Sequence, residues 1–345
     1  MTNHCHRFKV RTYCATYNHE SYILDALNGF VMQQTTFPVV YTIVDDASTD
    51  KTLEVLREFV DACFDLHETN LAYEKDTEYG HVTFARHKTN KNCYFAIIYL
   101  NENHYSQKKS KASYLTEWMD TKYVAFCEGD DYWTDPMKLQ KQVDFLENNA
   151  EYVACFCRCS IFYESENRMT DKDQFDGIIQ KGQKGLDLAG SVGVLPQLLT
   201  MVYRKEVLGR SEWYYKLNLR SQYDQTMIFA IGELGKIWVL NDNMGVYRRH
   251  KGGVATSLSK KQAAEKMYLT WHDVFEVHPN EETKAMYSNS LKQYMYFLIK
   301  NGRNRSELKT LNKEYKCLKE PWKQRVGFWG RLVKGLVIRS VKLTD

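Results

Sequence analysis

The sequence lacks the features that would assign it to several large classes of protein. No run of about eighteen apolar residues occurs, so no segment predicts a transmembrane helix. The first seven residues, Met-Thr-Asn-His-Cys-His-Arg, have no apolar core of the kind found in a signal peptide. These absences predict a cytoplasmic protein.

The nine cysteines do not follow a zinc-binding spacing, and their odd number fits reduced thiols better than disulfides. Cys155, Cys157 and Cys159 alternate in a segment of strand-like composition, so we expect them to share one face of a strand. A metal site at these cysteines is the less favoured alternative, because a strand rarely wraps three thiolates around one ion.

The net charge of +4 hides a strong asymmetry along the chain. Residues 300–345 hold 13 Lys and Arg against 4 Asp and Glu, so the remaining residues are acidic overall. No base-reading motif is visible, and nucleic acid is not an expected partner. Residues 328–343 place apolar side chains on one side of a helical wheel and basic side chains on the other. This tail is predicted to lie at an anionic membrane surface; the alternative is that it packs on the rest of the protein.

An apolar segment, Tyr123–Phe126, stops abruptly at a cluster of acids, Glu128, Asp130 and Asp131. The segment is typical of a strand buried on both faces, and in open α/β sheets ligands bind beyond the carboxyl ends of the strands. Closely spaced carboxylates repel one another unless a cation joins them, and such oxygen ligands suit Mg²⁺ or Mn²⁺. The alternative is a solvated acidic turn that precedes a helix.

Residues 1–150 predict alternating strands and helices, and hence a parallel sheet. Residues 61–111 have a weak pattern, which suggests an insertion or long loops. The expected strands are residues 8–17, 37–44, 93–100 and 123–126, and the expected helices are residues 20–31, 51–60, 114–119 and 137–148.

The pattern after residue 150 is more irregular. A strand is expected at 152–163, a surface loop at 164–193, a strand at 195–203, a helix at 221–235 and a hairpin at 236–253. The end of the hairpin carries Arg248, Arg249 and His250 and two glycines, which could contact phosphate; the alternative is an ordinary turn with solvated charges. Beyond Ser259 the pattern is helical, which indicates an appendage.

Five motifs together resemble family 2 glycosyltransferases of GT-A fold: Thr16-Tyr-Asn18, Val44-Asp-Asp-Ala-Ser-Thr-Asp50, Glu128-Gly-Asp-Asp131, Tyr223-Asp224 and Tyr247-Arg-Arg-His250. The resemblance implies a GT-A glycosyltransferase domain at 1–256 and a helical C-terminal region with a basic amphipathic tail at 257–345. It implies transfer of a sugar, with inversion, from a nucleotide-diphosphate sugar, usually UDP-linked. The expected acceptor is a saccharide or lipid-linked saccharide, in cell-surface polysaccharide synthesis.

The same resemblance implies roles for individual residues. The base, ribose and diphosphate of the donor would be bound by Thr16, Tyr17, Asn18, Asp45, Asp46, Lys111, Asp130, Arg249 and His250. A divalent cation, Mn²⁺ or Mg²⁺, would be held by Asp130, Asp131 and His250, with the larger contribution expected from Asp131. Asp224 would be the base that activates the acceptor, although an acid is also favoured at a helix N-terminus by the dipole alone. Glu128 departs from the family, which more commonly has aspartate at that position.

Two other functions remain as alternatives. A nucleotidyltransferase would also use an α/β sheet and paired acids, but the glycine-rich phosphate loop often seen early in such enzymes is missing. A non-catalytic binding module on the same fold would tolerate loss of the acids, whereas Asp46, Asp130, Asp131 and Asp224 are all present.

Overall fold

The computed structural model describes residues 7–67, 71–171, 196–218, 221–253, 258–301 and 305–319. The chain divides into two compact units. The sheet unit consists of residues 1–212 and 227–253, and the helical unit of residues 213–226 and 254–345. The basic tail at 328–343 and most of the predicted loop at 164–193 lie outside the described residues. Among those described, no helix is both long and apolar enough to cross a bilayer.

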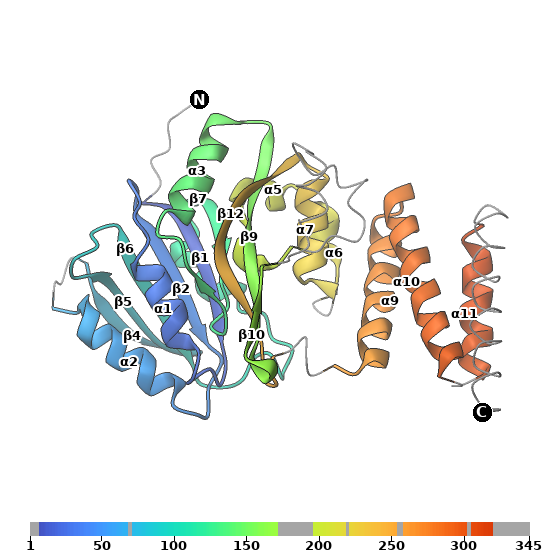
Figure 1. Ribbon diagram of the computed structural model, residues 1–345, viewed down its shortest axis with the longest axis horizontal. Helices are drawn as coiled ribbons and strands as arrows, with labels where there is room; N and C mark the ends of the chain where they lie inside the picture. The colour runs from blue at the N-terminus through green and yellow to red at the C-terminus, as the bar shows by residue number, and fades with distance from the viewer. Residues whose placement is uncertain are drawn as a thin grey trace. The chain divides into compact units, whose positions relative to one another are not determined.

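The sheet unit is built on one mixed sheet, in which the strands run in the order β3-β5-β6-β2-β1-β7-β11-β9-β12-β8 (Figure 1). The strands β6, β2, β1 and β7 at its centre are parallel, and most of the strands outside them pair antiparallel. This arrangement confirms the predicted α/β class. The strands are β1 Phe8–Thr16, β2 Val39–Asp45, β3 Phe64–Asp65, β4 Tyr73–Thr77, β5 Gly80–His87, β6 Cys93–Leu100, β7 Thr121–Phe126, β8 Tyr132–Trp133, β9 Tyr152–Tyr163, β10 Arg168–Thr170, β11 Val202–Arg204 and β12 Lys236–Arg249.

Both faces of the central strands are buried, which explains why β2 is apolar without alternation. Side chains alternate between the faces, so Tyr41 and Ile43 pack into one hydrophobic cluster and Val40 and Val44 into another. Helices α1 and α2 lie over the first face, and a 3₁₀ helix with Trp118 lies over the second. The helices are α1 Ile23–Val31, α2 Thr52–Cys63, α3 Lys138–Asn148, α5 Lys205–Gly209, α6 Glu212–Lys216, α7 Asp224–Gly232, α9 Lys260–Val277, α10 Glu281–Lys300 and α11 Arg305–Cys317, with 3₁₀ helices at Ala112–Trp118, Glu164–Glu166 and Leu198–Thr200.

The predicted hairpin at 236–253 is wrong. Lys236–Arg249 instead forms one long strand, β12, which pairs in parallel with β9, and a turn follows it. Its register shifts between Val239 and Asn243 and again before Val246. The polar residues that suggested a turn therefore form an irregular, bulged part of a continuous strand.

The predicted insertion or long loops at 61–111 contain more structure than the pattern indicated. Strands β4 and β5 form an antiparallel hairpin, and β5 extends the sheet beside β6. Most side chains of β4 are at least partly exposed, so the strand is polar and its sequence lacks the apolar alternation of a half-buried strand. The cysteine-rich strand was predicted correctly: Cys155, Cys157 and Cys159 all lie in β9 and are buried.

The helical unit has its own packed interior. Helices α9 and α10 each begin with a capping box, formed by Ser259 with Gln262 and by Asn280 with Thr283. Capping boxes satisfy backbone N–H groups that the first helical turn leaves unpaired. The predicted helical character beyond residue 259 is confirmed as far as residue 317.

Candidate active site

The acid turn after β7 lies directly against the end of β1. The backbone N–H of Gly129 donates to the carbonyl of Ala15 across 2.9 Å. A Cβ at Gly129 would lie 2.7 Å from Oγ1 of Thr16 and 3.0 Å from Nδ1 of His19. Both distances are too short for a side chain to fit without moving its neighbours, so a glycine is needed here for the close approach of the two turns.

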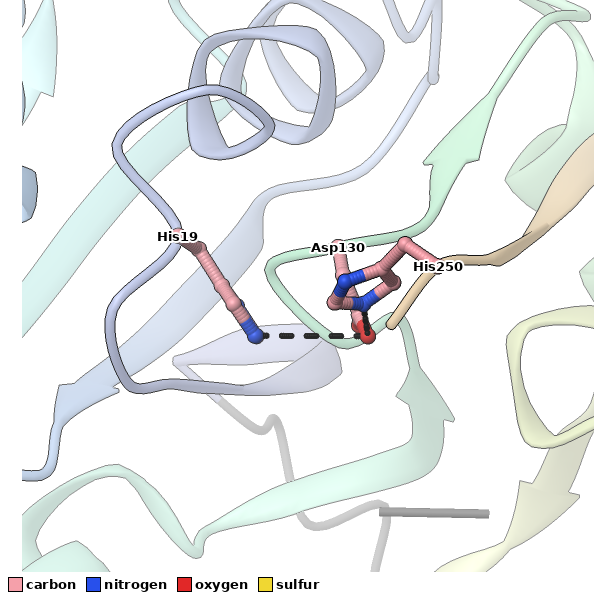
Figure 2. Close-up of side chains that lie close together, drawn as sticks. All are labelled: His19, Asp130 and His250. Carbon is pink, nitrogen blue, oxygen red and sulfur yellow. Dashed lines mark hydrogen bonds and ion pairs between the residues drawn. The ribbon is translucent and has the colours of Figure 1, made fainter. Parts of the chain in front are cut away.

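Asp130 projects from this turn toward two imidazole rings. Nε2 of His250 lies 2.9 Å from Oδ2 of Asp130, and Nε2 of His19 lies 4.0 Å from the same oxygen. Figure 2 shows that the rings come from different elements, His19 from the turn after β1 and His250 from the end of β12. Three segments far apart in the sequence therefore meet at one carboxylate.

The surroundings shift the titration of these groups. Burial alone would raise the pKa of Asp130, but the hydrogen bond from His250 and the charges of the two histidines outweigh it and hold this pKa below its usual value. Burial lowers the pKa of His19, against the attraction of Asp130. The arrangement thus favours an ionised carboxylate at Asp130 beside two imidazole rings, and carboxylate and imidazole are both groups that bind metal ions.

Asp131 has a different environment from Asp130. It is buried, and its Oδ1 accepts a hydrogen bond of 2.8 Å from the backbone N–H of Arg248. Burial, reinforced by the charge of Asp130, raises the pKa of Asp131 well above its usual value. The Arg248 guanidinium also donates to the carbonyl of Asp130 and pairs with Asp25 at 2.6 Å. Asp131 and Arg248 therefore fasten the end of β12 to the acid turn.

Strand alternation separates the two arginines at the end of β12. Arg248 and His250 are buried on the side of the acid turn. Arg249 is exposed, and its guanidinium lies 5.5 Å from the ring centre of Tyr163. Of the predicted pair, His250 thus reaches the Asp130 cluster and Arg249 faces the other way, while Arg248 occupies the place expected for a basic side chain.

A second acidic group lies at the carboxyl end of β2. Asp46 is buried, and its oxygens accept from the backbone N–H groups of His104 and Tyr105 at 2.9 and 3.0 Å. Nζ of Lys111 lies 2.8 Å from Oδ2 of Asp46. The structure therefore brings Lys111 to Asp46, a contact that the sequence pattern did not indicate. Nδ1 of His104 is buried and has no hydrogen-bond partner in the described part of the chain.

The remaining predicted donor contacts mostly shape the turns. Asp45 accepts hydrogen bonds from both the side chain and the backbone of Ser48, and its pKa is raised by burial. Oδ1 of Asn18 accepts from the backbone of Thr49 at 2.8 Å. Asn18 has a positive φ of 55°, which asparagine tolerates better than most residues. Tyr17 remains 42% exposed beside these turns, where its ring is available to a ligand.

Asp224 belongs to the helical unit, where it is the first residue of α7. Its side chain is exposed, and desolvation by the surrounding protein atoms raises the pKa of its carboxyl, an effect that the charge of Lys266 opposes. Nζ of Lys266 lies 4.8 Å from the ring centre of Tyr223.

The side chains present fit a divalent cation. Ligand atoms of His19, Asp130 and His250 lie within 4.8 Å of one another, and so do those of Glu128, Asp130 and Asp131. Asp130 belongs to both groups. The second group is the weaker candidate, because Asp131 is buried and one of its oxygens is engaged by the Arg248 backbone.

The sequence pattern did not indicate a role for His19 or His104, and it did not distinguish Arg248 from Arg249. Strand alternation could have placed Arg248 and His250 on one face, since they are two residues apart. No local signal marks His19 or His104, because their neighbours in space are 111 and 58 residues away in the chain.

The chain is similar in sequence to known proteins. The model of the family described as glycosyl transferase family 2 matches residues 14–208. An uncharacterised protein of Mycobacterium tuberculosis is 30% identical over 248 residues, which cover 69% of this chain and 58% of that protein. The chain therefore spans less than two thirds of the length of this relative. A Bacillus subtilis protein that carries the name "Putative teichuronic acid biosynthesis glycosyltransferase TuaG" is 23% identical, over 76% of this chain and 87% of its own.

Solved structures are similar in fold. Staphylococcus aureus TarS in complex with UDP-GlcNAc has a TM-score of 0.55 at 17% identity, over 95% of this chain and 81% of that chain. TarS with UDP has a TM-score of 0.52 at 17% identity, over 87% and 76% of the two chains. These likenesses support the predicted GT-A fold.

Proposed function

The chain belongs to glycosyl transferase family 2, and from this premise we propose that it is an inverting, metal-dependent glycosyltransferase. Its donor is a UDP-sugar and its acceptor a saccharide or lipid-linked saccharide. The observation that carries the proposal is the presence of two side-chain pairs in the sheet unit, Asp46 with Lys111 and Asp130 with His250. Asp46 and Asp130 follow the carboxyl ends of β2 and β7, the two parallel strands on either side of β1. Ligands bind at that edge in open α/β sheets.

Similar proteins support the choice of donor and pathway. TarS has been solved with UDP and with UDP-GlcNAc. TuaG is named for teichuronic acid biosynthesis, which makes synthesis of a cell-surface polysaccharide the proposed setting.

Each group in the sheet unit has a chemical task in this proposal. Asp46, held rigidly by two backbone N–H groups and Lys111, accepts a hydrogen bond from the base or ribose beside Thr16 and Tyr17. Asp130 and His250 hold the cation, which when bound offsets the negative charge that grows on the leaving diphosphate. Arg248 keeps the acid turn in place through its contacts with Asp130.

Asp224 is the proposed general base. A carboxylate oxygen of Asp224 takes the proton of the acceptor hydroxyl while the oxygen of that hydroxyl forms a bond to the anomeric carbon of the donor sugar. The bond between the anomeric carbon and the diphosphate oxygen breaks, and the nucleotide leaves from the opposite face, which inverts the configuration. A positioned base of this kind contributes about 10²–10⁴-fold to the rate.

Ligand binding and turnover test the proposal directly. With Mn²⁺, UDP at about 100 times its Kd is expected to stabilise the full-length chain by about 2.7 kcal/mol, measured as an increase in Tm, whereas adenine nucleotides are expected to do less. UDP release from a UDP-sugar should then depend on a saccharide acceptor. A nucleotidyltransferase would instead release pyrophosphate from a nucleoside triphosphate, and a binding module would bind the donor without releasing UDP. Absence of any uridine-specific stabilisation with Mn²⁺ or Mg²⁺ would overturn the proposal.

The basic tail is proposed to hold the protein at the inner face of the cell membrane. Residues 328–343, which lie outside the described residues, combine Trp329 and several leucines and valines with four basic residues. Each basic residue near an anionic surface contributes about 1 kcal/mol, which suffices for reversible binding without a membrane span. This location would place the active site beside a lipid-linked acceptor.

Vesicle co-sedimentation checks the membrane proposal. Full-length protein is expected to sediment with anionic vesicles and much less with neutral ones, and a chain ending at Glu320 is expected to stay in the supernatant. The circular dichroism of the shortened chain serves as the control for folding. Equal sedimentation of both proteins, or no preference for anionic lipid, contradicts the proposal.

A further inference from the structure

His19 has the orientation of a metal ligand. Its Nδ1 lies 3.2 Å from Oγ1 of the buried Thr16, and its Nε2 faces the Asp130 carboxylate. Metal-binding histidines commonly donate the N–H of one ring nitrogen to an oxygen, which fixes the tautomer and leaves the lone pair of the other nitrogen for the ion. Thr16 is in position to accept such a hydrogen bond.

The ring of His19 is held from several sides. The turn after β1 is fastened by a hydrogen bond of 2.8 Å from the His19 N–H to Oγ1 of Thr52. Tyr22 packs against both imidazoles, with its ring centre 6.1 Å from that of His19 and 4.6 Å from that of His250. Gly129 leaves just enough room for the ring on the side of the acid turn. Ligands held in place before the ion arrives lose little conformational entropy on binding it.

The spacing of the ligand atoms suits one octahedral ion. Two ligands each about 2.1 Å from a cation lie about 3 Å apart when adjacent and about 4.2 Å apart when opposite. Oδ2 of Asp130 lies 2.9 Å from Nε2 of His250 and 4.0 Å from Nε2 of His19. Figure 2 shows both rings directed at this oxygen.

We propose that His19, Asp130 and His250 form a two-histidine, one-carboxylate site that prefers Mn²⁺ or Co²⁺ to Mg²⁺. Imidazole nitrogens suit the transition metals, whereas Mg²⁺ favours oxygen ligands and strict geometry. Three protein ligands on an octahedral ion leave about three positions for diphosphate oxygens and water. This proposal adds the identity of the ion to the proposed function. It rests on the proposed function in one respect, the assignment of the donor diphosphate to the remaining coordination positions.

The experiment measures binding of Mn²⁺ alone to the full-length chain, without nucleotide or acceptor. Electron paramagnetic resonance titration is expected to show one tight site, and pulsed spectra of the bound ion are expected to show ¹⁴N coupling from two imidazoles. His19→Gln is expected to remove one of these couplings and to lower the Mn²⁺ affinity at least about tenfold. Loss of a residue that only hydrogen-bonds to a metal ligand already lowers metal affinity by about 10–100-fold, and loss of a ligand should cost at least as much. Mg²⁺ in excess should displace Mn²⁺ more easily from this variant than from the wild type.

Two further variants serve as controls. His67→Gln removes an exposed histidine away from the cluster and should leave the titration unchanged. His19→Ala should lose the coupling in the same way, and added imidazole should restore it by entering the vacated place. Circular dichroism shows whether each variant folds.

Two results overturn the proposal: unchanged Mn²⁺ affinity and nitrogen coupling in both His19 variants, or equal affinities of the wild type for Mg²⁺ and Mn²⁺. The first result would mean that His19 only forms an ion pair with Asp130. Failure of the proposed function is a separate outcome, in which the chain binds Mn²⁺ through two imidazoles but neither binds UDP nor transfers a sugar.

Discussion

Asp130→Ala is expected to abolish the dependence of UDP binding on Mn²⁺. Asp130 is the carboxylate toward which both imidazoles point, and it belongs to both groups of candidate metal ligands. Its removal leaves the two imidazoles without the negative charge that attracts the ion, so Mn²⁺-dependent affinity should fall by at least about tenfold. Isothermal titration of UDP with and without Mn²⁺ measures the effect.

A comparison with Asp131 sharpens this test. The sequence favoured Asp131 as the more important of the two acids, but the structure shows its carboxylate buried and bonded to the Arg248 backbone. Asp131→Ala leaves that N–H unpaired, at a cost of about 1–3 kcal/mol in the free energy of unfolding. Asp131→Ala should thus lower Tm, whereas Asp130→Ala should mainly lower ion affinity. Asp76→Ala, at an acid that is 93% exposed, is the control and should change neither quantity. Unchanged Mn²⁺-dependent UDP affinity in Asp130→Ala would refute the assignment.

Asp224→Asn is expected to reduce sugar transfer by about 10²–10⁴-fold while UDP affinity stays the same. Asparagine has nearly the same shape but cannot take a proton from the acceptor hydroxyl. The carboxylate must be ionised to act, so the rate should rise with pH through the pKa of Asp224. Desolvation raises this pKa. The wild-type rate should therefore begin to fall, as the pH is lowered, at a pH above the usual pKa range of aspartate. This fall should be missing from the variant.

Glu281→Gln is the matched control for Asp224→Asn. Glu281 is the first residue of α10, as Asp224 is of α7, and its side chain is 91% exposed. Both substitutions remove a negative charge from a helix N-terminus, so both lose the same small dipole stabilisation. Only Asp224→Asn should lose transfer. A variant that keeps more than about a tenth of the wild-type rate would show that Asp224 is not the base.

Local sequence patterns predicted the strands reliably where both faces of a strand are buried, because burial then determines which side chains occur in it. The apolar segments that became β2, β6 and β7 were predicted because parallel strands covered on both faces need continuous apolar side chains. Strand β4 was missed because its partly exposed, polar side chains carry no such pattern. The continuous strand β12 was taken for a hairpin because a bulge and a turn use the same polar residues, and only pairing with β9 distinguishes them.

By itself, the sequence determined that acids and basic side chains stand at the ends of strands, because parallel topology brings those ends to one edge of a sheet. Only the tertiary structure decided which of them meet. It directed Asp130 toward two imidazoles and Asp131 into the protein, it turned the side chain of Arg248 rather than that of Arg249 toward the acid turn, and it brought His19 into the cluster. The physical reason is that these contacts join segments more than a hundred residues apart. Their geometry depends on packing between elements, such as the close approach at Gly129, which no local pattern contains.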